Sequence, residues 1–265
     1  MSESIESYLF DDEEPSVSTL NPSGASLYVF TCDHASNRIP RRIGHMGLSD
    51  DEMLSHIAWD PGALEVAKGL SRALNAPLIF SNYSRLVLDL NRPPSSRGHI
   101  PEVSAGITIP ANRAASPQER EARLRAFFLP YHGAISDIID NRLNRAMPTL
   151  LVALHSFTGD YPGETRPWHI GVTHRFDMGL GAEIVRLLRE RTDLCIGDNQ
   201  PYQIDDVDDV TIPFHAEKRG LPNALIEMRQ DILISQRDIA EMIEHFSDVF
   251  SLAAATVLEQ SGNPR

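Results

Sequence analysis

Two short apolar segments of this chain, residues 27–31 (LYVFT) and 149–154 (TLLVAL), each run directly into a polar turn that carries a histidine. Apolar runs of this length, bounded by polar turns, are typical of strands buried on both faces of a parallel sheet. The turns place His34 in CDHASNRIP and His155 in HSFTG. Because ligands of open α/β sheets bind outside the carboxyl ends of such strands, we expect both histidines at the mouth of one site.

Beyond residue 26, strand patterns alternate with amphipathic helix patterns. Residues 61–74 carry apolar side chains at helical spacing, with Pro61 suited to the first turn and Asp60 suited to the N-cap. Further strands are predicted at 77–81, 85–91, 170–174 and 224–229, and further helices at 117–146, 179–191 and 235–260. This order predicts a three-layer α/β/α fold with a central mixed, mostly parallel sheet.

The first 25 residues differ in composition from the rest of the chain. They hold acidic side chains but no basic one, together with Ser, Pro and Gly. We therefore expect a mobile acidic tail over residues 1–25 and a single α/β domain over residues 26–265. An alternative is that Tyr8, Leu9 and Phe10 dock on a neighbouring surface.

The overall charge restricts the kinds of partner. A formal net charge of −13 gives no electrostatic footprint for nucleic acid or an anionic membrane, so we expect neither as a partner. No apolar run reaches the roughly 18 residues of a membrane helix, and the N-terminus lacks a signal-like segment. The two cysteines, Cys32 and Cys195, fit a reducing compartment, which favours a cytoplasmic location. A homo-oligomer stays open, because no pattern marks an interface.

Two histidines alone leave a zinc site one protein ligand short of the three that catalytic zinc usually has. Asp60 in HIAWDPGA is the best third candidate, although the same carboxylate could simply cap the helix that follows. The two roles are compatible because a carboxylate has two oxygens. We therefore predict a Zn²⁺ site of His34, Asp60 and His155, while manganese, iron or cobalt would accept similar ligands.

The segment YSRLVLDLNRPP places charged side chains within an apolar strand pattern. Strand alternation would put Arg85, Asp89 and Asn91 on one face. The simplest interpretation of the first two is a structural ion pair. Asn91 and Arg92 precede two prolines, which would hold a planar guanidinium in a rigid turn. Such a group binds a carboxylate through two hydrogen bonds, so we predict that Asn91 and Arg92 bind substrate.

Glu227 lies inside the apolar stretch ALIEM, with His215 upstream in a predicted loop. Burial raises the pKa of a carboxyl group toward the range that is useful for general acid–base catalysis. Structural explanations stay open, because Arg229 could neutralise Glu227 and His215 could be an ordinary loop histidine. Cys32 beside His34 is a weaker candidate for a metal-free nucleophile, since no nearby cation is evident to lower the pKa of its thiol.

These segments together resemble the N-formylglutamate amidohydrolase family over roughly residues 26–245. The resemblance rests on HASNRIP, WDPGA, YSRLVLDLNRPP, PYHGAI, LHSF and GLPNALIEMRQD. The family is similar to zinc carboxypeptidases and aspartoacylase-like deacylases, which implies a zinc-exopeptidase-like fold. It also implies a zinc hydrolase that cleaves the N-formyl or another short N-acyl amide of an acidic amino acid, such as N-formyl-L-glutamate.

The resemblance also implies roles for individual residues. Together with His215, whose candidacy rests on its place upstream of Glu227, these residues fall into three groups: metal ligands His34, Asp60 and His155; substrate-binding Asn91 and Arg92; and catalytic Arg85, His215 and Glu227. Glu227 would be the general base, and Arg85 or His215 would stabilise the oxyanion. The alternative is a non-catalytic protein on the same fold that binds a carboxylate or another anionic metabolite, although such a protein needs no base.

Two segments depart from the pattern that is common in the family. The first site reads DHAS in place of PHAG, so Cys32, Asp33, Ser36 and Asn37 could alter the floor of the pocket. The segment HIAWD stands where the family often has WHVD, and this displaces His56. Both departures bear on which amide the protein cleaves.

Overall fold

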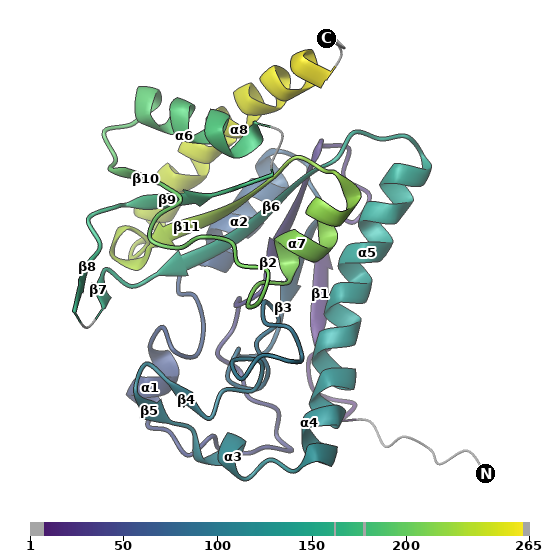
Figure 1. Cartoon of the computed structure of the whole chain (residues 1–265), viewed down its shortest axis with the longest axis vertical. Helices are drawn as coiled ribbons and strands as arrows, with labels where there is room; N and C mark the ends of the chain where they lie inside the picture. Colours follow the sequence, from purple (N-terminus) through teal and green to yellow (C-terminus); the bar gives the residue numbers. More distant parts are fainter. Residues whose placement is uncertain (1–7, 162, 177–178, 262–265) are drawn as a thin grey trace.

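The structure, a computed structural model, describes residues 8–161, 163–176 and 179–261. Its centre is a seven-stranded sheet in the order β1-β3-β2-β6-β11-β9-β10 (Figure 1). The strands of this sheet are β1 (Val17–Leu20), β2 (Tyr28–Cys32), β3 (Leu78–Ser81), β6 (Leu150–Phe157), β9 (Ile170–Thr173), β10 (Ile196–Asp198) and β11 (Asn223–Arg229). Two short hairpins lie outside it, β4 (Val103–Ser104) with β5 (Ile107–Thr108), and β7 (Asp160–Tyr161) with β8 (Glu164–Thr165).

The sheet is mixed and mostly parallel, as the sequence predicts. Strands β3, β2, β6 and β11 run parallel to their neighbours in this block. Strand β1 is antiparallel to β3 at one edge. Strand β9 is antiparallel to β11, and β10 is parallel to β9 at the other edge. The parallel block therefore brings the carboxyl ends of β2, β6 and β11 to the same edge of the sheet.

Helices cover both faces of the sheet and give three layers (Figure 1). The helices are α1 (Asp50–Leu54), α2 (Ala63–Ala73), α3 (Pro110–Arg113), α4 (Pro117–Arg123), α5 (Leu129–Asn144), α6 (Leu180–Arg191), α7 (Thr211–His215) and α8 (Gln236–Ser261). Helices α2, α6 and α8 pack with Phe30 of β2, whereas α5 and α7 pack with Val29 on the opposite face. This alternation follows from the two-residue period of a strand. Among the described residues, no helix combines the length and apolar composition needed to cross a bilayer.

The predicted strand over residues 85–91 is wrong. The segment forms a series of turns, in which the backbone N–H of Val87 donates to Ser84 and that of Asp89 donates to His99. Its apolar side chains are all buried, but Leu86 packs in a small cluster around Met46 and the other leucines pack under α5. The alternation of apolar and polar residues over 85–91 thus arises because the apolar side chains are buried in two separate clusters. A chain of turns can bury them in this way as well as a strand can.

The predicted helix over residues 117–146 contains an irregular turn. The chain forms a π-helical turn at Leu124–Phe128 between α4 and α5. Pro130 lies in the first turn of α5. A proline lacks the N–H for the regular helical bond, and its ring clashes with the carbonyl four residues earlier, so a wider turn accommodates it.

The expected mobile tail over residues 1–25 differs from the structure where that segment is described. Residues 1–7 lie outside the described residues. Tyr8 is 7% exposed and packs edge-on against Phe127, with ring centroids 5.4 Å apart. Strand β1 then adds to the edge of the sheet through antiparallel pairing with β3. The acidic composition of this segment gives no sign of these contacts, because they depend on a few apolar side chains and on backbone hydrogen bonds.

Candidate metal centre

Three neighbouring parallel strands bring the main predicted site residues together. His34 follows the end of β2, and Glu227 lies within β11. His155 lies inside β6, whereas the sequence places it in the turn after a strand ending at residue 154. In the sheet, Glu227 is directly across from His155. Paired residues on adjacent strands project from the same face, so this register sets a carboxylate beside the imidazole.

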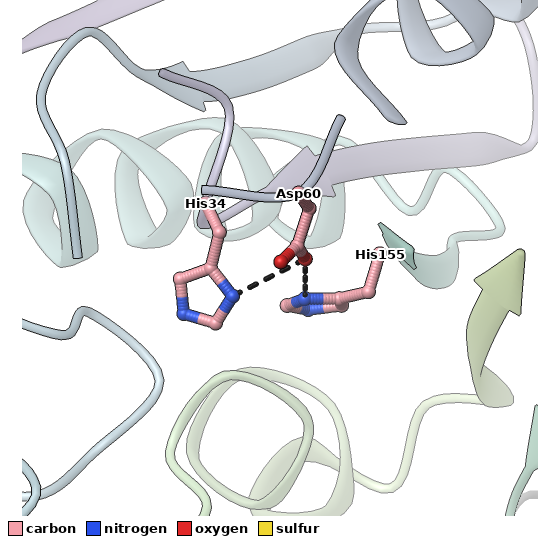
Figure 2. A group of neighbouring side chains, drawn as sticks. All are labelled: His34, Asp60 and His155. Atoms are coloured by element: carbon pink, nitrogen blue, oxygen red, sulfur yellow. Dashed lines mark hydrogen bonds and ion pairs between the residues drawn. The ribbon is translucent and has the colours of Figure 1, made fainter. Parts of the chain in front are cut away.

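Figure 2 shows that the imidazoles of His34 and His155 both point at the carboxylate of Asp60. Asp60 Oδ2 lies 3.3 Å from Nδ1 of His34 and 3.0 Å from Nδ1 of His155. One ligand atom from each of the three residues lies within 4.8 Å of the others, and all three side chains are buried. The structure therefore assembles the predicted group of possible metal ligands from three separate segments.

The sequence suggested that Asp60 could cap the helix that follows it, but the structure shows a different N-cap. The N-cap of α2 is Gly62, whose φ of 81° lies in the left-handed region that favours glycine. A side chain at this position would also collide with Leu233, whose Cβ would lie 2.6 Å from the added Cβ. With the cap formed elsewhere, the Asp60 carboxylate turns to the histidines and accepts a hydrogen bond from the backbone N–H of Ser156.

Each histidine contacts a second carboxylate through its other ring nitrogen. His34 Nε2 lies 2.8 Å from Asp89 Oδ1, and His155 Nε2 lies 3.1 Å from Asp33 Oδ2. Metal-binding histidines commonly bond a carboxylate in this way, which fixes the ring and the nitrogen that faces the ion. Neither Asp33 nor Asp89 was predicted to hold a histidine in this way. The sequence did contain one signal for Asp33, because this carboxylate directly precedes the candidate ligand His34.

The electrostatics of the group suit a cation. Burial opposes charge on His155, but its hydrogen bonds to Asp33 and Asp60 raise the pKa of the imidazole well above its ordinary value. Burial likewise opposes charge on Asp60, yet His34 and His155 hold the pKa of that carboxyl well below its ordinary value. The protein alone thus stabilises protons on the nitrogens that face Asp60, and a bound metal would replace them.

The donor set also leaves an oxygen free for a metal. Asp60 Oδ1 is buried and accepts no hydrogen bond from any described residue, with Arg85 Nη1 at 3.6 Å. Two imidazole nitrogens and a carboxylate are the usual protein ligands of catalytic zinc, which keeps a further position for water or substrate. The residues present therefore fit a Zn²⁺ ion or a similar divalent metal.

Glu227 is buried at the same site, with 8% of its surface exposed. Burial, reinforced by the charge of Asp60 and opposed by His155, raises the pKa of Glu227 to about 7. Its Oε2 has no hydrogen-bond partner within the described part of the chain. Arg229 does not neutralise it, because that guanidinium bonds Asp231 and backbone carbonyls next to β9. A carboxyl group with this pKa can take up and release a proton near neutral pH.

A cleft of about 310 Å³ opens onto these groups. It is lined by the three possible metal ligands and by Arg85, Asn91, Arg92 and Glu227, among others. Arg85 pairs with Asp89, as the sequence predicted, with Nη2 2.7 Å from Oδ2. Seven of the eight predicted site residues therefore line one cleft.

The predicted substrate-binding pair is engaged with a segment of the cleft wall. Arg92 Nη1 donates to the backbone carbonyl of Asp208 and to Asp209 Oδ1, at 2.6 Å and 3.0 Å. The side-chain amide of Asn91 donates to Asp209, while its oxygen accepts from the N–H groups of Val210 and Thr211. Asn91 and Arg92 therefore both bind this segment, and both also line the cleft.

His215 lies apart from the other predicted residues. It is absent from the described residues that line the cleft, and its Nε2 lies 2.8 Å from Nδ1 of His132. Burial, with the charges of His132 and Arg219, lowers the pKa of His215 to about 3. The predicted contact of His215 with a substrate oxyanion is not favoured by this placement.

His56, which the sequence left without a role, does line the cleft. Its Nδ1 lies 3.9 Å from Asp60 Oδ1, and burial lowers its pKa to about 4.

Cys32 is fully buried, and burial together with Asp60 and Asp33 raises the pKa of its thiol. A buried thiol with a raised pKa is a poor nucleophile, which argues against the metal-free alternative.

Comparisons with known proteins bear on the family and the fold of this chain. The family model for N-formylglutamate amidohydrolase matches residues 26–234. The solved structure of gene product Atu2144 from Agrobacterium tumefaciens is 34% identical, with a TM-score of 0.90, over 94% of this chain and 99% of that chain. N-formylglutamate amidohydrolase from Ralstonia eutropha is 14% identical, with a TM-score of 0.67, over 93% of this chain and 100% of that chain, which shows a shared fold. No curated protein matches the chain.

The extent of the family match decides the assignment. It spans the strands and turns that carry all three possible metal ligands, as well as Glu227 in β11. The sequence-based resemblance is therefore confirmed, and the chain belongs to the N-formylglutamate amidohydrolase family.

Proposed function

We propose that this protein is a metal-dependent amidohydrolase that removes a formyl or other short acyl group from the nitrogen of an amino acid. The observation that carries the proposal is the buried His34–Asp60–His155 group with Glu227 beside it in the sheet register. Family membership supports hydrolysis of an amide. It also makes N-formyl-L-glutamate, an acidic N-acyl amino acid, the first substrate to test.

A divalent metal held by His34, Asp60 and His155 would polarise the amide carbonyl and lower the pKa of a nearby water. Glu227 accepts the proton of the attacking water through Oε2, which has no hydrogen-bond partner among the described residues. As the bond between carbon and the amide nitrogen breaks, Glu227 passes this proton to the departing nitrogen. The products are a short carboxylic acid and the free amino acid.

Arg85 supplies positive charge next to the reacting carbonyl. Its guanidinium lies between Asp89 and Asp60 and lines the cleft. A fixed donor of this kind stabilises the oxyanion and typically contributes about 10²–10³-fold to the rate. Arg92, further along the wall, faces the part of the substrate that carries a carboxylate.

The binding-protein alternative explains less of the site. A protein that only holds an anion gains nothing from a buried glutamate beside the proposed metal, because the carboxylate repels the ligand. The pKa of Glu227, raised to about 7, instead suits a group that takes up and releases a proton near neutral pH. This feature favours turnover.

Formate release tests the proposal. The protein is loaded with Zn²⁺ and supplied with N-formyl-L-glutamate, N-acetyl-L-glutamate or N-formyl-L-alanine, and the acid released is measured. We expect turnover of at least one substrate, loss of turnover after chelation, and recovery when the metal is returned. A protein that binds zinc but releases no acid from any of the three would contradict the proposal.

Replacing Arg92 with alanine should raise KM for N-formyl-L-glutamate by about 10- to 150-fold with little change in kcat. The reason is the loss of a charged hydrogen bond to a substrate carboxylate, which is worth about 1.5–3 kcal/mol. Initial-rate kinetics measure the effect. Arg97→Ala is the matched control, because Arg97 is exposed and lies outside the residues lining the cleft. An unchanged KM would limit Arg92 to holding the Asp208–Asp209 segment.

A further inference from the structure

Asp33 is a buried carboxylate that contacts His155, one of the three proposed metal ligands. It lies next to His34 in the chain and is 1% exposed. Its Oδ2 lies 3.1 Å from Nε2 of His155, although the two residues are far apart in sequence. The hydroxyl of Thr211 donates to the same carboxylate at 3.0 Å, and the hydroxyl of Tyr131 donates to its Oδ1. A buried charge persists only with such partners, so Asp33 is held in one orientation.

An ionised carboxylate can only accept hydrogen bonds, whereas a neutral imidazole carries one N–H and one lone pair. Asp33 therefore requires the N–H of His155 at Nε2. When His155 is neutral, as a metal ligand must be, its lone pair is then on Nδ1, the nitrogen that lies 3.0 Å from Asp60 and gives up its proton when a metal binds. The opposite tautomer would set a lone pair against the carboxylate and an N–H toward the position of the ion.

We propose that Asp33 is a positioning residue, which fixes the tautomer and ring orientation of His155 so that Nδ1 is presented to a metal. The inference rests on the proposed function, because it concerns the metal of that site. Asp89 contacts His34 in the same manner but also pairs with Arg85. The other partners of Asp33 are the neutral hydroxyl groups of Tyr131 and Thr211. The negative charge of Asp33 therefore interacts chiefly with the histidine.

Zinc affinity of the Asp33→Asn protein tests this role. An asparagine keeps the shape of the side chain but can turn an N–H toward Nε2, so the correct tautomer is no longer imposed. We expect Zn²⁺ binding, measured by competition with a chelator, to weaken about 10–100-fold, as for other partners of metal-binding histidines. Tyr131→Phe is the matched control, because it removes one donor to Asp33 and leaves the contact with His155. Its zinc affinity should stay close to that of the unaltered protein.

The protonated nitrogen of His155 gives a second, independent readout. In zinc-loaded, ¹⁵N-histidine-labelled protein, NMR should show the proton of His155 on Nε2, with the signal assigned by its loss in His155→Gln. This measurement on the unaltered chain stands even if Asp33→Asn does not fold. A proton on Nδ1, unchanged zinc affinity of a folded Asp33→Asn protein, or failure of the unaltered protein to bind zinc would each overturn the inference.

These readouts separate the two proposals. Metal affinity and the tautomer are measured without substrate. A zinc-loaded protein that shows the expected tautomer and the expected loss in Asp33→Asn, but hydrolyses no N-acyl amino acid, would contradict the proposed function and leave the role of Asp33 in place.

Discussion

Glu227→Gln should remove nearly all hydrolytic activity while zinc and substrate still bind. Glutamine keeps the size of the side chain but cannot accept a proton from water. General-base catalysis typically contributes about 10²–10⁴-fold, so we expect kcat to fall by that factor. Formate release measures kcat, chelator competition measures zinc binding, and calorimetry measures substrate binding. Glu244→Gln on α8 is the control, because Glu244 is exposed and outside the lining of the cleft.

The pH profile makes this prediction more specific. Glu227 must be ionised to act as a base, so kcat/KM of the unaltered protein should rise with pH as this carboxyl loses its proton. Burial raises its pKa to about 7 in the protein alone, and a nearby cation would move the rise to lower pH. The residual activity of Glu227→Gln should lack this rise. Full activity in Glu227→Gln, or a variant profile that keeps the same acidic limb, would exclude Glu227 as the base.

Asp60→Asn should abolish metal binding at ordinary zinc concentrations. Asp60 Oδ2 is the atom that both histidines face, and an amide offers neither the charge nor the second anionic oxygen of the carboxylate. A group that only hydrogen-bonds a metal-binding histidine already contributes about 10–100-fold to metal affinity. Loss of the Asp60 carboxylate, a proposed ligand itself, should therefore weaken zinc binding by on the order of 100-fold or more. Chelator competition and elemental analysis of the purified protein measure the loss.

The control for Asp60→Asn is a histidine–aspartate pair away from the cleft. Asp198 accepts from Nε2 of His174 at 3.0 Å and is 45% exposed at its side chain. Asp198→Asn should therefore leave zinc affinity and turnover unchanged. If Asp60→Asn keeps both at the level of the unaltered protein, Asp60 is not a ligand, and its contacts with the two histidines are structural.

Much of the fold is predictable because burial leaves a local pattern. The apolar segments at 27–31 and 149–154 become the adjacent parallel strands β2 and β6, and the helical spacing over 61–74 becomes α2. Periodicity was insufficient at 85–91, where alternating residues are buried in separate clusters and the backbone turns. It also could not detect β1, whose place depends on pairing with the edge of β3.

The sequence by itself determined the order of the larger strands and helices, apart from β1, β10 and the turns at 85–91, and it supplied the chemical groups of the predicted site: two histidines and an aspartate as metal ligands, and a glutamate as base. These follow from residue type and from position along each element. Only the tertiary structure decided which groups meet. It joined Asp33 to His155, committed Asn91 and Arg92 to Asp209, and placed His215 with His132. Such contacts join segments far apart in the chain, and their hydrogen bonds depend on the packing of strands and helices, which no local pattern encodes.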